Sequence, residues 1–234
     1  MELIWQGIVK AVELVFGLDA EIWEITWLSL KISGSATLIS LLLGVPLGIA
    51  LALIRFRGRN ATVALINTGM GLPPVVVGLF ISIFLWRSGP LGFMELIYSP
   101  TAMVIAQAIL VTPSIAGLSR QVLEDAWHEY EEQLRSLGAT PTAAAATLLW
   151  DTRYSLVTVV LAGFGRAAAE VGAVIIVGGN IEGVTRVMTT AISLETSKGD
   201  LPLALGLGLI LVAVVFLINA AAQIIKTAAV RRYG

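Results

Sequence analysis

The sequence EYEEQLRSLGATPTAAAATLLWDTR, which spans Glu129–Arg153, is a polar, charge-bearing stretch between two long apolar runs. Connections between helices in a bundle are usually short, on the order of 2–8 residues. This stretch is longer, is rich in helix-forming alanine, and carries a glycine joint at Gly138. These features predict a helical block outside the membrane that serves as a docking surface for another protein.

Composition places the rest of the chain in a membrane. Of the 234 residues, 57% are hydrophobic and 13% are charged, and the mean hydropathy is +0.88. A soluble domain carries about 25% charged residues. The net charge of −1 says nothing about nucleic acid, but the 15 basic residues form no block, and we expect no nucleic-acid partner. The absence of cysteine excludes disulfides and thiolate metal sites.

Five segments are long and apolar enough to cross a bilayer, which takes about 20 mainly apolar residues. They are Trp27–Ile54, Val63–Trp86, Thr101–Leu123, Tyr154–Val177 and Leu201–Ala229. Each is expected to be helical, because backbone in lipid must satisfy its own hydrogen bonds. No long repeat or linker divides the chain. The prediction is therefore an all-α polytopic membrane helical bundle, with about five transmembrane helices in one domain over residues 1–234.

Basic residues orient the spans. The first connection, Arg55–Arg59, carries three arginines, and cytoplasmic connections are enriched in Lys and Arg. This connection is therefore expected inside, which also places the block at 129–153 and the basic tail (Lys226, Arg231–Arg232) in the cytoplasm. The N-terminus is then expected outside. The chain ends soon after the last span, so we expect no fused regulatory domain on it.

Residues 1–22 precede the first span and lack the basic region and cleavage site of a signal peptide. The segment is too short and too polar to cross a bilayer comfortably, so we expect an interfacial helix on the outer side. A sixth, weakly hydrophobic span is the alternative, and it would reverse only the N-terminus. The apolar residues that share one helix face are Ile4, Trp5, Ile8, Val12 and Val15.

The second span contains a cluster of glycine and proline in the sequence NTGMGLPPVVVGLF. Proline inside a helix removes a hydrogen bond and bends it, and glycine permits close backbone approach. Pro73, Pro74 and Gly78 are therefore candidates for a bent helix that lines a pathway. A simple packing kink is the alternative.

The fourth span holds the one charged pair expected deep in the membrane. Arg166 and Glu170 are four residues apart, which places them on one helix face. Each would cost roughly 2.5–3.5 kcal/mol at a helix centre, so both are expected to face protein or water. We predict a structural or gating ion pair in preference to direct contact with a passing anion. Asn180 follows in a glycine-rich outer turn, and an amphipathic stretch at 184–195 could contact a partner or rest on the bundle.

Three stretches carry a family resemblance. Glu132-Gln133-Leu134, followed by Gly138 and Ala139, resembles the coupling loop of ABC importer permeases, with Gln and Leu at two alanine positions of that motif. The run Leu72–Gly78 resembles the second core helix of oxyanion importers. The stretch from Gly165 to Ala173, with the Gly-Gly-Asn turn and the sequence TRVMTTAI, resembles tungstate-type ABC permeases, to which molybdate and sulfate permeases are related. The resemblance covers about residues 26–228.

This resemblance implies a type I ABC importer permease fold in a prokaryotic cytoplasmic membrane. It further implies a homodimer that forms the pathway, two ABC ATPase subunits and an extracytoplasmic oxyanion-binding protein. The residues expected at the ATPase are Glu131, Glu132, Arg135, Gly138 and Ala139. Those expected along the pathway or gate are Pro73, Pro74, Gly78, Arg166, Glu170 and Asn180.

The predicted spans lack the residues that an intramembrane enzyme would need for catalysis. The single histidine, His128, lies outside every predicted span, no aspartate lies inside one, and no phosphate-binding loop for ATP occurs. We therefore expect no catalytic residue, metal or cofactor on this chain, and ATP hydrolysis in a partner. The cargo hypothesis is tungstate, with molybdate, sulfate or phosphate as alternatives, and an ion-gradient-driven secondary transporter as a further one.

Overall fold

The computed structural model describes residues 2–17 and 20–233, and its regular structure there is helical. The helices in chain order are α1 (Glu2–Phe16), α2 (Ala20–Leu53), α3 (Arg59–Met70), α4 (Pro74–Leu85), the 3₁₀ turn η1 (Gly92–Met94), α5 (Pro100–Ser136), α6 (Pro141–Asp151), α7 (Arg153–Ala168), α8 (Gly172–Gly178), α9 (Met188–Lys198) and α10 (Leu201–Tyr233).

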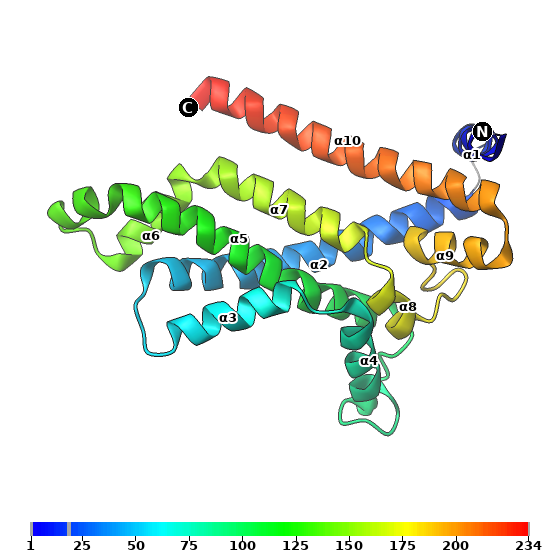
Figure 1. Ribbon diagram of the computed structural model, residues 1–234, viewed down its shortest axis with the longest axis horizontal. Helices are drawn as coiled ribbons and strands as arrows, with labels where there is room; N and C mark the ends of the chain where they lie inside the picture. Colours follow the sequence, from blue (N-terminus) through cyan, green and yellow to red (C-terminus); the bar gives the residue numbers. More distant parts are fainter. Residues whose placement is uncertain (1, 18–19, 234) are drawn as a thin grey trace.

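Three long helices, α2, α5 and α10, are each apolar enough to cross a membrane, and they run along the long axis of the molecule (Figure 1). The helices α2 and α5 make the most extensive contact in the bundle. Small polar groups join them, since the hydroxyl of Ser40 donates to the carbonyl of Ala108 at 3.2 Å and that of Thr112 lies 3.2 Å from Ser40. This pair forms the frame on which the shorter helices are mounted.

Two further segments are bent pairs of helices. The helices α3 and α4 meet at 99°, and α7 and α8 meet at 56°. If each pair is one span, the described residues contain five spans, as the apolar runs predict. The second run is not the continuous bent helix that we expected, because the helix stops at Met70 and restarts at Pro74. A residue that precedes proline is kept out of helical geometry, so Leu72-Pro73-Pro74 forces a full break.

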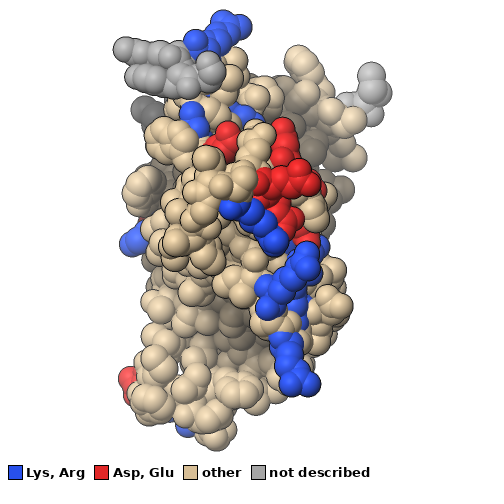
Figure 2. All heavy atoms as spheres, turned by 90° about the vertical axis from the view of Figure 1, so that its left-hand side faces the viewer, with Lys and Arg blue, Asp and Glu red and all other residues tan. Residues whose placement is uncertain are grey.

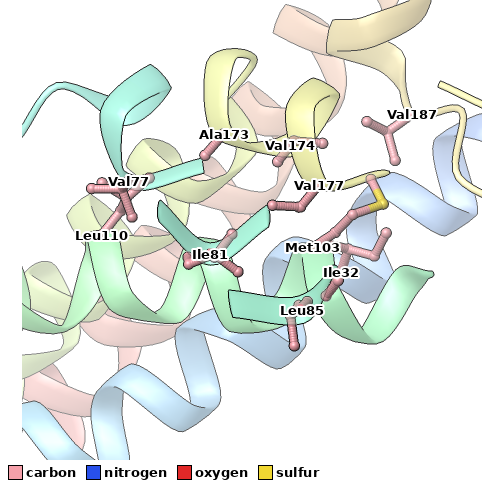
Figure 3. Close-up of a cluster of buried hydrophobic side chains, with 12 residues drawn as sticks. Ile32, Val77, Ile81, Leu85, Met103, Leu110, Ala173, Val174, Val177 and Val187 are labelled. Atoms are coloured by element: carbon pink, nitrogen blue, oxygen red, sulfur yellow. The ribbon is translucent and has the colours of Figure 1, made fainter. Parts of the chain in front are cut away.

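The two half-helices α4 and α8 pack against each other and against α5. Figure 3 shows side chains from these helices converging in one apolar cluster, with Ile32 of α2 and Val187 at its edge. Contact between the half-helices is close, because a Cβ built on Gly78 would lie 2.7 Å from the Cα of Ala173. The small residues at these positions therefore allow the two backbones to touch.

The first helix, α1, covers fewer residues than the predicted segment 1–22, because α2 already begins at Ala20; residues 1, 18 and 19 lie outside the described residues. Its 15 residues measure about 22 Å, less than the thickness of a bilayer core. It packs against α10. In Figure 1, α10 runs lengthwise and α1 is seen nearly end-on, so the two helices cross. A Cβ on Gly7 would collide with Leu205, so this crossing is tight as well.

Candidate functional site

The polar block begins as a continuation of α5. The helix runs on to Ser136 because no proline or glycine interrupts it after Gly117, and the chain turns two residues later at Gly138, whose φ of 70° is in the left-handed region. The N–H of Ala139 donates to the carbonyl of Leu134 at 2.9 Å, and that of Gly138 donates to Arg135 at 3.0 Å. This pair of bonds resembles the Schellman arrangement, in which glycine at the left-handed position closes a helix.

After this joint the chain reverses into α6. The side chain of Thr140 caps the helix by accepting from the N–H of Ala143 at 3.3 Å, and Pro141 occupies the first turn. Ala144 and Leu148 are buried, and Leu148 packs with Leu123 of α5 and Ala52 of α2. The helix α6 is therefore packed against the ends of α2 and α5, the two helices that share the most extensive contact. The same end of the bundle also carries the connection at 54–58 and the last residues of α10. We call it the α6 end.

The outer surface of the block combines apolar and charged side chains. Leu137 is 82% exposed and Trp150 is 71% exposed, so both offer large apolar surface beyond the bundle. Arg153 stacks between Trp150 and Tyr154, with its guanidinium carbon 4.4 Å from each ring centre. This stacking holds the Trp150 ring in place.

The predicted docking residues lie together on this surface. Glu131 pairs with Arg135 at 2.5 Å along one helix face, Glu132 and Gly138 are exposed, and Ala139 is half-buried. The carboxylates of Asp151 and then Glu129 raise the pKa of the neighbouring Tyr130 hydroxyl, which stays neutral at physiological pH. The block therefore presents an acidic patch, visible on the face in Figure 2 beside a strip of basic side chains.

One charged cluster at the α6 end was not predicted. Arg59, the first residue of α3, donates from Nη2 to Glu124 at 2.7 Å and from Nε to the carbonyl of Leu51 at 2.7 Å. Arg120 binds the other oxygen of Glu124 at 2.8 Å. This cluster ties the connection at 54–58 to α5. The four-residue spacing of Arg120 and Glu124 in an apolar segment was a usable signal, but the partner on α3 was not visible in the sequence.

Of the predicted pathway residues, Pro73, Pro74, Arg166 and Glu170 lie at or next to the breaks of the two bent pairs, whereas Gly78 lies inside α4 and Asn180 follows α8. Pro73 and Pro74 begin α4, and a Cβ on Gly172 at the start of α8 would lie 2.9 Å from Val75. Gly78 is buried in the α4–α8 contact and does not face open space. The structure therefore brings the two breaks side by side, with Gly78 as a packing position.

The predicted ion pair between Arg166 and Glu170 is wrong. The helix α7 ends at Ala168, so the two residues do not share a helix face, and no ion pair joins them. Glu170 instead accepts from the N–H of Ala173 at 3.0 Å and so caps α8. Within the described part of the chain, the half-buried side chain of Arg166 has no hydrogen-bond or ion-pair partner.

Two residues that are not among the predicted site residues hold this break in place. Gln107 of α5, only 3% exposed, donates from Nε2 to the carbonyl of Ala167 at 3.0 Å, and its Oε1 has no partner among the described residues. Thr189 donates from its hydroxyl to the carbonyl of Glu170 at 2.9 Å. A lone glutamine inside an apolar run was the available signal for Gln107.

Asn180 lies in the turn that follows α8, with a φ of 51° and a buried Oδ1 that accepts no hydrogen bond from the described residues. The turn is closed by Thr185, whose hydroxyl donates to the carbonyl of Gly178 at 2.5 Å and accepts from the N–H of Ile181. Asn180 therefore lies fourteen residues beyond Arg166 in the chain, in a turn that hydrogen bonds close.

Comparisons with known proteins agree with this geometry. Residues 44–234 match the family described as binding-protein-dependent transport system inner membrane component. The chain is 42% identical to a tungstate uptake system permease protein, TupB, of Peptoclostridium acidaminophilum, over 94% of this chain and 96% of that protein. It is 40% identical to a probable anion ABC transporter permease protein of Haloferax volcanii, over 84% and 87% of the two chains.

The fold has a solved counterpart in the MetNI methionine ABC transporter in an inward-facing conformation. The match has a TM-score of 0.76 at 18% identity, and it covers 91% of this chain and 97% of the other. At this identity the likeness concerns the fold alone. The family match and the identity along nearly the whole chain show that the protein belongs to the ABC transporter permeases, the multi-pass inner-membrane components of binding-protein-dependent transport systems.

Proposed function

We propose that this chain is the permease of an ATP-driven tungstate importer. The observation that carries the proposal is the 42% identity, along 94% of the chain, to a protein described as a tungstate uptake permease. Permeases of this family operate with an ATPase subunit and a binding protein. In the proposed assembly two copies of the chain enclose the pathway, two ATPase subunits bind them, and the binding protein delivers tungstate from outside.

The α6 end is the proposed docking surface for the ATPase and faces the cytoplasm. The basic connection Arg55–Arg59 lies at this end, as cytoplasmic connections do. Trp150 and Leu137 offer exposed apolar anchors, and a large aromatic such as Trp150 is typical of the residues that carry binding energy in interfaces. Glu131, Glu132 and Arg135 supply the charged rim of this surface. By the same orientation the N-terminus is outside, and α1 lies in the outer interface.

The pathway residue that we propose to meet the anion is Arg166. An unpaired arginine on a membrane helix must face water or a counter-charge rather than lipid. It lies thirteen residues beyond the start of α7 at Arg153, which is about 20 Å along the helix axis. A guanidinium presents a fixed fork of N–H donors, which suits the oxygens of a tetrahedral oxyanion. The loss of the expected Glu170 partner leaves this charge available.

The proposed gate is the junction of α4 and α8. Gly78 against Ala173 makes this contact too close for the half-helices to slide independently, so they move as one body when the ATPases draw the α6 ends together. Pro73 and Pro74 fix the break about which α4 turns. Asn180, in the rigid outer turn, is the proposed mouth of the pathway.

The test of the cargo is metal accumulation in host cells with and without the gene, at low external tungstate and under excess sulfate. Selective loss of tungsten in cells that lack the gene supports the proposal. Loss of molybdenum accumulation with tungsten accumulation unchanged would indicate that the substrate is molybdate. Uptake that persists when the ATPase subunit carries an inactivated nucleotide site would support an ion-gradient-driven transporter and contradict the proposal.

A further inference from the structure

A basic crevice of about 300 Å³ lies at the α6 end, between the end of α2, the connection to α3, and α5. Polar and charged groups form most of its wall. The side chains that matter for the argument are Arg55, Arg59, Trp127, His128 and Arg135, with Glu124 as the one acidic residue in the wall. The site lies apart from α8, α4 and Arg166; of its lining residues, the transport proposal uses only Arg135, at the rim of the docking surface, and assigns no task to Arg55, Arg59 or His128.

The single carboxylate in the wall is already neutralised. Both oxygens of Glu124 are used, one by Arg59 at 2.7 Å and the other by Arg120 at 2.8 Å. Two arginines on one glutamate leave a surplus positive charge. Arg135 is balanced by Glu131, but Arg55 has no partner in the described part of the chain. The crevice therefore has a net positive charge, although the α6 end, which faces the viewer in Figure 2, also carries acidic side chains.

The donors on the wall are partly fixed and partly free. Arg59 is held by two bonds of its guanidinium, to Glu124 and to the carbonyl of Leu51, near the end of α2. A guanidinium has five N–H donors, so three remain. Arg55 and the ring nitrogens of His128 have no bond within the described residues. A phosphate group accepts several such bonds from a fork of arginine donors.

The surroundings of the crevice are those of a membrane interface. The crevice begins where α2 ends, at Leu53, and Trp127 supplies an amphipathic ring of the kind found at headgroup level. Ile54 is 51% exposed and Phe56 is 44% exposed, and they alternate with Arg55 and Arg57. An apolar side chain next to each basic one suits a segment that lies between acyl chains and headgroups.

We propose that this crevice binds the phosphate group of an anionic phospholipid from the adjacent membrane leaflet. Basic pockets between membrane helices are suited to lipid headgroups, and Lys or Arg near the membrane surface favours anionic lipid. Arg55 and the free donors of Arg59 contact the phosphate, and Ile54 and Phe56 contact the acyl chains. The bound lipid would fix the end of α2 and the α2–α3 connection to the membrane surface.

The chain offers a matched pair of variants for the test. Arg55 lines the crevice, whereas Arg57 lies in the same connection, is also exposed, and does not line it. Arg55→Gln and Arg57→Gln therefore make the same charge change two residues apart. Arg59 is unsuitable, because its removal would also break the contact with Glu124.

The measurement is native mass spectrometry of the purified full-length chain, titrated with phosphatidylglycerol and, in parallel, with phosphatidylcholine. We expect a preference for phosphatidylglycerol that Arg55→Gln weakens by about fivefold and Arg57→Gln leaves within about twofold. An equal loss in both variants, or no preference for the anionic lipid, would overturn the proposal. So would displacement of the lipid by inorganic phosphate or tungstate at matched ionic strength, because it would assign the crevice to a free oxyanion.

Discussion

Glu170 caps the N-terminus of α8 through the N–H of Ala173, at 3.0 Å, and makes no ion pair with Arg166 in the described structure. The two charges were expected to neutralise each other on one helix face. The break after Ala168 separates their functions instead. The carboxylate stabilises a half-helix, and the guanidinium has no hydrogen-bond or ion-pair partner among the described residues.

This separation predicts how the two residues respond to substitution. Glu170→Ala removes the capping acceptor and should lower stability by about 0.5–2 kcal/mol, whereas Glu170→Gln keeps an acceptor oxygen and should cost less. Thermal unfolding in detergent measures both. In a double-mutant cycle with Arg166→Ala the two changes should add to within about 0.5 kcal/mol, and a coupling well above that would restore the ion pair.

The charge of Arg166 should matter for transport and not for folding. Hydrogen bonds to charged groups contribute about 1.5–3 kcal/mol, so Arg166→Gln should reduce tungstate uptake by about tenfold or more. Arg166→Lys keeps the charge, loses the fork of donors, and should retain part of the activity. Uptake into proteoliposomes with the ATPase and binding protein measures this effect. Unchanged uptake by a folded Arg166→Gln variant would remove Arg166 from the pathway.

Gly138 should be sensitive to backbone conformation rather than to size. A Cβ at this position meets no atom within 4 Å, but a φ of 70° is costly for a β-branched residue. We therefore expect Gly138→Val to displace α6 and uncouple ATP hydrolysis from uptake, and Gly138→Asn to be tolerated. The ratio of tungstate transported to ATP hydrolysed is the readout.

The chain contains a control for this experiment. Gly183 has a φ of 68° and equally open surroundings, but it lies in the turn between α8 and α9. Gly183→Val imposes the same backbone cost far from α6 and should leave the coupling ratio unchanged. A parallel loss of coupling in both variants would mean that general destabilisation is responsible.

Gly78 should be sensitive to size. A Cβ on Gly78 would lie 2.7 Å from the Cα of Ala173, so Gly78→Ala forces the half-helices α4 and α8 apart and should cost about 1–3 kcal/mol. A Cβ on Gly34, in α2, would meet no atom within 4 Å, so Gly34→Ala should leave stability unchanged or higher. Thermal unfolding of the two variants tests the contact, and equal melting temperatures would contradict it.

The sequence predicted the parts of the fold that depend on hydropathy and proline. The last run was expected to begin at Leu201 and α10 does, and the third was expected at Thr101 against an observed start at Pro100. The helix α5 extends beyond its apolar part because no breaker occurs between Gly117 and Gly138. The positions at which these helices begin and end therefore follow from local chemistry.

The break after Ala168 does not follow from local chemistry. Three consecutive alanines favour a helix there, and neither glycine nor proline lies between Arg166 and Glu170. The observed break is held by contacts from distant parts of the chain, from Gln107 to the carbonyl of Ala167 and from Thr189 to the carbonyl of Glu170. Tertiary contacts override local helix propensity at this point. The four-residue spacing rule, which holds only within one helix, therefore wrongly pairs Arg166 with Glu170.

The unbroken course of α5 has a mechanical consequence. Its 37 residues form a rod of about 55 Å, with Leu123 packed against α6 toward one end and Met103 packed into the α4–α8 cluster near the other. The helix is continuous, but Pro113 lies inside it between these two contacts, and an interior proline removes one helical hydrogen bond. In the proposed mechanism, a tilt imposed on α6 would therefore reach the two half-helices through α5, with Pro113 as the point at which this helix can bend and its long contact with α2 as the support.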